Sequence, residues 1–207
     1  EAVSVAREDL KAALGLLDAR HVAGAAALTG ALRQQVYAAW RKDSRKRLPE
    51  LVESVTERAT RAGELAFLLE PDLKEARGGI RDVHAITGIA ASWVADAPSP
   101  AVREAYGWLQ DVRGELHRRS SRGSDRLVAQ ERIPVARALG IDDPDQLMRR
   151  VFEAGRTIAF ALDESCRRAI VASRPERRWG RRGSTPVRRP LAEGVVEQDG
   201  EVHLARE

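Results

Sequence analysis

The chain has 207 residues, one cysteine and a formal net charge of +4. This length suffices for one or two domains with a buried core. It has no apolar run long enough to span a membrane, no signal-peptide pattern, and with Cys166 alone no internal disulfide, so we expect a cytoplasmic protein. Because the chain opens at Glu1 in a helix-like pattern, we expect a piece of a longer polypeptide.

The positive charge is concentrated near the carboxyl end. Residues 174–190 contain seven arginines and one glutamate, a local charge of +6, so the rest of the chain carries −2. The Pro, Gly and Arg content of this stretch predicts a linker, and such charge runs are usually solvated. Only Trp179 could stack on a base, so we do not expect a nucleic-acid partner.

The amino-terminal third is predicted to be helical with one short strand. Apolar residues recur at helical spacing over residues 3–14, 26–40 and 48–69, and Pro71 ends the last of these segments. The apolar run at residues 16–20 predicts a strand that carries Asp18.

Further helices are predicted after a glycine pair at residues 78–79. One begins near Ile80 and runs toward Pro98 and Pro100, and another spans residues 101–119. The last long helix begins at Asp143-Pro144, a favourable cap and first position, and runs to about Ala172. Cys166 flanks its apolar stripe and is expected to be a buried small residue. Past the linker, Asp199-Gly200 between two apolar runs predicts a β-hairpin.

The segment around the glycine pair has the composition of an anion site. Lys74, Arg77 and Arg81 supply charge, and Gly78-Gly79 would let the backbone approach a ligand where the helix presents unpaired N–H groups. A helix entry with solvated charges is the alternative interpretation.

The residue string around this pair resembles the PII-protein uridylyltransferase family. Glu70-Pro71-Asp72-Leu73-Lys74-Glu75 and Gly78-Gly79-Ile80-Arg81-Asp82 match its motif, with Ile80 in place of leucine. Gly88, where the family often has tryptophan, is a departure that affects local packing. Further matches are Leu16 to Arg20, Leu116-His117, Asp125-Arg126-Leu127, Gln130, Leu139-Gly140 and Leu147-Met148-Arg149.

The resemblance implies a mainly α fold in which a helical bundle follows the last strand and helix of a nucleotidyltransferase fold. On this basis residues 1–25 end a nucleotidyltransferase domain and residues 26–173 form the helical domain. Residues 174–190 are then the linker, and residues 191–207 form a hairpin that starts a following domain.

The same resemblance implies a nucleotidyltransferase that transfers UMP or AMP, from UTP or ATP, to the PII signal protein in response to glutamine, with Mg²⁺ as cofactor. The implied nucleotide contacts are Lys74, Arg77, Gly78, Gly79, Arg81 and Asp82. Asp18 would be a third metal carboxylate, and a surface residue paired with Arg20 is its alternative. The family supplies its other carboxylates from a Gly-Ser and Asp-x-Asp constellation on a mixed sheet, and because no such sheet is predicted here, we expect the fragment to be inactive alone.

Two other interpretations stay open. The glutamine synthetase adenylyltransferases carry a similar Gly-Gly-Ile-Arg helix entry, although their flanking residues differ from those of this chain. A helical interaction module without catalysis, which binds a partner through the first turn at Ile80, is the other. No His-Asp dyad for phosphodiester hydrolysis is visible in the sequence, so we do not expect the uridylyl-removing activity of the family in this chain.

Overall fold

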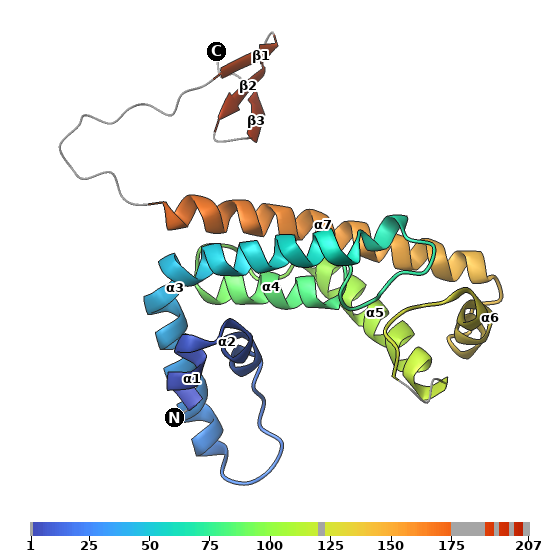
Figure 1. Cartoon of the computed structure of the whole chain (residues 1–207), viewed down its shortest axis with the longest axis horizontal. Helices are drawn as coiled ribbons and strands as arrows, with labels where there is room; N and C mark the ends of the chain where they lie inside the picture. Colours follow the sequence, from blue (N-terminus) through green and yellow to red (C-terminus); the bar gives the residue numbers. More distant parts are fainter. Residues whose placement is uncertain (1, 120–122, 175–188, 193–194, 199–200, 205–207) are drawn as a thin grey trace. The chain divides into compact units, whose positions relative to one another are not determined.

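The computed structural model describes residues 2–119, 123–174, 189–192, 195–198 and 201–204. The chain forms two compact units, Glu1–Arg174 and Pro175–Glu207. The first unit is mainly helical (Figure 1). Its helices are α1 (Ala2–Glu8), α2 (Leu10–Leu17), α3 (Ala26–Ala62), the short 3₁₀ helix η1 (Leu65–Phe67), α4 (Ile80–Ala91), α5 (Pro100–Arg119), α6 (Ala129–Ala138) and α7 (Pro144–Ser173).

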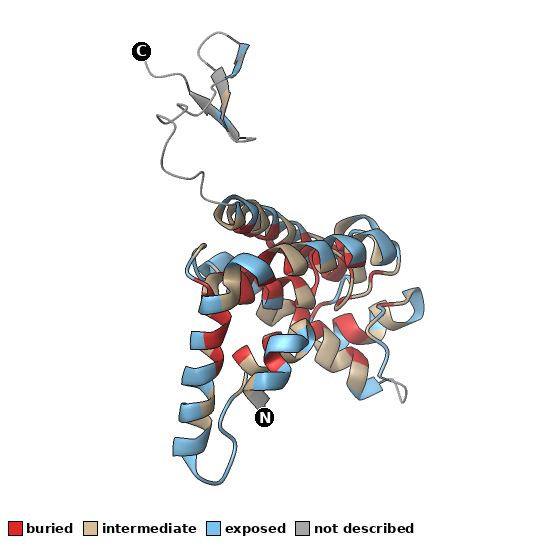
Figure 2. Cartoon of the chain, turned by 60° about the vertical axis from the view of Figure 1, so that its left-hand side comes forward, coloured by how far each residue is buried: buried red, intermediate tan, exposed pale blue. Residues whose placement is uncertain are grey.

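The core of the first unit lies between three helices, α3, α4 and α7, which run side by side (Figure 1). Helix α5 packs on α4 and α7, α6 covers one end of α7, and α1 and α2 pack on α3. The buried residues fall on the inward faces of these helices (Figure 2). The predicted apolar stripe of α7 is confirmed, since Leu147, Val151, Ala154 and Ile158 are all buried.

The predicted strand at residues 16–20 is wrong. Leu16 and Leu17 end helix α2, and Asp18 is its C-cap. Asp9 is the N-cap of helix α2, and its side chain accepts hydrogen bonds from the N–H groups of Lys11 and Ala12 at 2.7 and 3.3 Å. This cap also separates α1 from α2, so the single helix predicted over residues 3–14 is two helices.

Helix α3 joins two segments that the sequence analysis separated. It runs without interruption from Ala26 to Ala62, passes through Pro49, and ends at Gly63 with φ of 73°. Its two halves run in different directions (Figure 1). A proline inside a helix bends it, because the proline has no backbone N–H to donate to the preceding turn. The predicted continuation to Leu69 is wrong, because η1 and an extended segment follow Gly63.

The carboxyl half departs from prediction at α4 and α6. Helix α4 begins at Ile80 as predicted but ends at Ala91, well before Pro98, and Pro100 is the first residue of α5. Helix α6 was not predicted. It is short, contains Pro134, and has only Val135 and Ala136 buried, so its apolar periodicity is weak.

In the second unit, β1 (Arg189–Ala192), β2 (Val195–Gln198) and β3 (Glu201–Leu204) form an antiparallel sheet in that order. Arg189 and Pro190, predicted as linker, lie in β1. The predicted Asp199-Gly200 turn, Trp179 and most of the arginine-rich stretch lie outside the described residues. No helix in the described part of the chain is long and apolar enough to cross a membrane.

Candidate functional site

The loop before α4 is held by its own backbone and by Asp72. One oxygen of the Asp72 side chain accepts hydrogen bonds from the N–H groups of Lys74 and Glu75 at 2.9 and 2.7 Å. The Arg77 N–H donates to the carbonyl of Gly63 at 2.8 Å, which joins the loop to the end of α3. Asp72 is therefore a turn residue of this loop.

The start of α4 offers no free backbone donors to a ligand. The Gly78 N–H donates to Asp82 Oδ2 at 2.6 Å, and the Gly79 N–H donates to the carbonyl of Ala76 at 2.8 Å. The N–H groups of Ile80, Arg81 and Asp82 donate to other carbonyls of the same segment. The prediction of unpaired N–H groups at this helix start is wrong, because the tight loop supplies an acceptor for each of them.

The glycine pair is required by packing against the rest of the unit. Gly78 has φ of 85°, and a Cβ built there would lie 2.3 Å from the carbonyl oxygen of Gly155 in α7. A Cβ on Gly79 would lie 2.7 Å from the carbonyl oxygen of Ala76. Both glycines thus serve close backbone approach within the protein.

Asp82 joins the glycine loop to helix α3. Its side chain is almost fully buried and forms an ion pair with Arg58, while its other oxygen accepts from Gly78. Burial raises the pKa of Asp82 above its ordinary value, although the charge of Arg58 and the Gly78 N–H favour the ionised form.

Arg77 is turned toward α7. Its Nη2 lies 2.6 Å from Asp163 Oδ2, and its Nε lies 3.8 Å from Glu64 Oε1. Nearby on α7, burial raises the pKa of the Cys166 thiol to about 11, as expected for a small core residue.

A cleft of about 590 Å³ lies on the other side of the loop. It is bounded by α2, α3, α4, the loop before α4 and the start of α5, and its volume is in the range of small-molecule sites. Of the predicted site residues, Asp18, Lys74 and Arg81 line it. Arg77, Gly78, Gly79 and Asp82 do not.

The two predicted cations in the cleft are held by carboxylates that lie outside its lining. Lys74 Nζ is 3.5 Å from Asp125 Oδ2, and Arg81 Nε is 3.0 Å from Glu75 Oε1. Asp125 also accepts from Arg113 and His117 at 2.6 and 2.7 Å. Burial opposes ionisation of Asp125, but these two hydrogen bonds and the charges of Arg113 and Lys74 together outweigh it, so the pKa of Asp125 lies below its ordinary value.

His84 and Tyr106 form a pair in the wall of the cleft. His84 Nε2 lies 3.2 Å from the Tyr106 hydroxyl, and the two rings meet edge to face. Burial lowers the pKa of His84 below 6.5, against an opposing effect of the Asp18 charge, so the ring is neutral near pH 7.

Asp18 is exposed at the end of α2, where the Tyr37 hydroxyl donates to the carbonyl of Leu17 at 3.2 Å. A Mg²⁺ ion takes oxygen ligands, and within the described residues no group of three His, Cys, Asp or Glu side chains could hold a metal. Among the described residues Asp18 therefore offers one oxygen ligand and no complete metal site.

Three cations of the cleft were missed by the sequence analysis: Lys11, Arg58 and Arg103. For Arg58 a signal was available. It follows Leu51 and Val55 at helical spacing, so it is a charged residue on the apolar face of α3, and such a residue needs a buried partner.

The glycine at position 88, where the resembled family often has tryptophan, is explained by local packing. The Trp40 indole N–H of α3 donates to the Gly88 carbonyl at 2.8 Å, and a Cβ on Gly88 would lie 2.7 Å from Leu14 Cδ2. A side chain at position 88 would require the Leu14 side chain of α2 to move.

The family model and the similar proteins that match this chain all point to one family. The family model of the GlnD PII-uridylyltransferases matches residues 46–97 and 89–163. Bifunctional uridylyltransferase/uridylyl-removing enzymes align along the whole chain, with 53% identity in Streptomyces coelicolor, 43% in Mycobacterium tuberculosis and 31% in Corynebacterium glutamicum.

The chain covers 26% of the first two relatives and 29% of the third, so it spans little more than a quarter of their length. No solved structure matches it. The family model covers more than half of the chain, including the glycine pair and most of the helices that bound the cleft. The chain therefore belongs to the GlnD PII-uridylyltransferase family.

Proposed function

We propose that this chain is part of an enzyme that transfers UMP from UTP to the PII signal protein, and that its cleft forms one wall of the nucleotide site. The observation that carries the proposal is the convergence of Asp18, Lys74 and Arg81 on one cleft, although they come from α2, the loop and α4. The sequence alone did not require these residues to meet.

In this proposal the residues of the motif have two different roles. Lys74 and Arg81 contact the phosphates, because both face the cleft and are oriented by Asp125 and Glu75. Arg77, Gly78, Gly79 and Asp82 support the site from behind, because their contacts are with α7, α3 or their own loop.

The reaction needs stabilisation of negative charge. An acceptor hydroxyl oxygen on PII attacks the α-phosphorus of UTP, a phosphorus–oxygen bond forms, and the bond to pyrophosphate breaks. Cations placed at the phosphates stabilise the charge that builds on them in the transition state. Mg²⁺, held by Asp18 and by carboxylates from outside this chain, would supply further charge neutralisation when bound. Glutamine is proposed as the effector, following the family resemblance.

The test is the intact mass of PII after incubation with Mg²⁺, UTP and the longer enzyme that carries this chain. We expect a uridylyl adduct, and we expect Arg81→Gln and Asp18→Ala to slow its formation by about tenfold or more. The matched control is Arg149→Gln, since Arg149 is exposed on α7 and lies outside the cleft lining.

An adduct that forms at the same rate in all three variants would contradict the assignment of the cleft. A longer enzyme that modifies glutamine synthetase instead of PII would contradict the proposed substrate. ATP in place of UTP distinguishes the donors, because the mass of the adduct identifies the base.

A further inference from the structure

The cleft contains more positive charge than the motif supplies. Beside Lys74 and Arg81 it is lined by Lys11 from α2, Arg58 from α3 and Arg103 from α5. The acidic side chain in this lining is Asp18. Five cations from four helices and one loop thus face a space of about 590 Å³.

The carboxylates that balance these cations lie behind them. Asp82 binds Arg58, Asp125 binds Lys74 and Glu75 binds Arg81, and none of these three carboxylates lines the cleft. The Arg103 guanidinium donates to the carbonyl of Pro98, a neutral group, at 2.5 Å. Each of these contacts restricts a long side chain in the wall of the cleft.

Arg58 is the least exposed of the five. Only about a tenth of its side chain is exposed, and its described hydrogen bond is made by Nη2 to Asp82. A guanidinium has five N–H donors, so a buried arginine with one carboxylate partner keeps donors for a second anion.

We propose that Lys11, Arg58 and Arg103 complete, with Lys74 and Arg81, a binding site for the polyphosphate chain of a nucleoside triphosphate. The inference rests on the proposed function and adds three residues to it. A linear chain of several negative charges fits cations that approach from several elements, and the apolar floor formed by Leu14, Ile80 and Val83 leaves room for the nucleoside.

The probe is inorganic tripolyphosphate without metal, titrated calorimetrically into the 207-residue chain at physiological salt. We expect Lys11→Gln and Arg103→Gln each to weaken binding by about threefold to fivefold, because both side chains are exposed. Arg58→Lys keeps the charge but loses the planar fork, and we expect about tenfold weaker binding.

Each control makes the same substitution as a tested variant at a position outside the cleft: Lys46→Gln for Lys11→Gln, and Arg149→Gln for Arg103→Gln. Lys46→Gln on α3 and Arg149→Gln on α7 remove exposed charges outside the cleft and are expected to leave the dissociation constant unchanged. If Arg58→Lys fails to fold by circular dichroism, the two exposed positions decide the test. A chain that binds no tripolyphosphate would overturn the proposal, as would Lys11→Gln and Arg103→Gln variants that bind it as the control variants do.

The outcome separates this inference from the proposed function. Binding that depends on Lys11 and Arg103, together with a longer enzyme that leaves PII unmodified, would keep the polyphosphate site and refute the proposed substrate. Modification of PII that is insensitive to Lys11→Gln and Arg103→Gln would refute the site and keep the function.

Discussion

The two sides of the segment from Asp72 to His84 contrast sharply. One side, with Gly78 and Asp82, packs against α7 and α3, and its polar groups are satisfied by the protein. The other side, with Lys74 and Arg81, lines the cleft, and these two cations pair with Asp125 and Glu75. Similar residue types thus serve packing on one side and line the cleft on the other.

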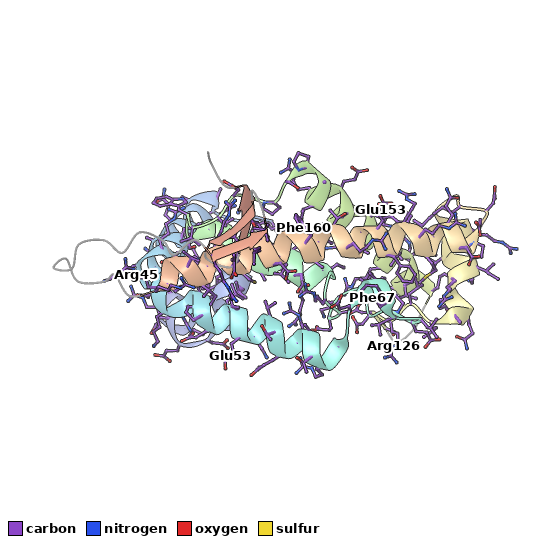
Figure 3. The ribbon with its side chains drawn as sticks, turned by 90° about the horizontal axis from the view of Figure 1, so that it is seen from above. Arg45, Glu53, Phe67, Arg126, Glu153 and Phe160 are labelled. Atoms are coloured by element: carbon purple, nitrogen blue, oxygen red, sulfur yellow. The ribbon has the colours of Figure 1, made fainter. Side chains whose placement is uncertain are left out.

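A charged residue in a motif therefore indicates a binding site only once the groups that it pairs with in the fold are known. Arg77 and Arg81 are four residues apart and chemically identical, yet Arg77 meets Asp163 of α7 whereas Arg81 meets a carboxylate of its own loop. Phe67 of η1 and Phe160 of α7 are exposed and lie outside the lining of the cleft (Figure 3).

Gly78→Ala is the largest expected change on the packed side. The new Cβ would overlap the carbonyl oxygen of Gly155, and the residue would keep a positive φ, so we expect a loss of more than about 4 kcal/mol in the free energy of unfolding. Urea denaturation measures it. Gly107→Ala in α5 is the control, since nothing lies within 4 Å of its Cβ, and its effect should stay within about 1 kcal/mol.

Asp82→Asn tests the buried ion pair. The substitution leaves Arg58 buried without its countercharge, and we expect a loss of about 3 kcal/mol in the free energy of unfolding. The exposed Asp111→Asn in α5 should change it by less than about 0.5 kcal/mol. Equal stabilities of the two variants would mean that the pair does not join α3 to α4.

Arg77→Gln and Arg81→Gln compare the two sides directly. Each arginine is partly exposed and paired, so each substitution should cost no more than about 1 kcal/mol of stability. Only Arg81→Gln should weaken tripolyphosphate binding, measured by the same calorimetric titration. A larger loss of binding in Arg77→Gln would restore Arg77 as a nucleotide contact and break the contrast.

The smallest expected effect is a pH dependence from His84. Because burial lowers its pKa in the folded chain, the unfolded chain takes up the proton first, and the stability of the fold declines as pH falls below 6.5. His84→Gln should remove this part of the decline in thermal unfolding followed between pH 7 and about pH 5. An unchanged pH profile in the variant would show that His84 does not titrate differently on folding.

The sequence alone predicted the mainly helical class, the start of α4 at Ile80 and the buried stripe of α7, because caps and apolar periodicity act over a few residues. It misassigned Leu16-Leu17 as strand, because a short apolar run has no clear period and the Asp9 cap that sets α2 was overlooked. It also missed α6, whose buried face is too small to give a pattern.

Which motif residues line the same cleft depends on contacts between residues far apart in the sequence. Gly78 meets Gly155 across 77 positions of sequence, and Arg58 meets Asp82 across 24. Lys11 of α2 and Arg103 of α5 line one cleft although they lie 92 positions apart in the sequence. Such contacts depend on how α2, α3, α4 and α7 pack, and local periodicity does not encode this packing. The motif could therefore be recognised in the sequence, whereas the packing of the helices decides which of its residues are packed and which line the cleft.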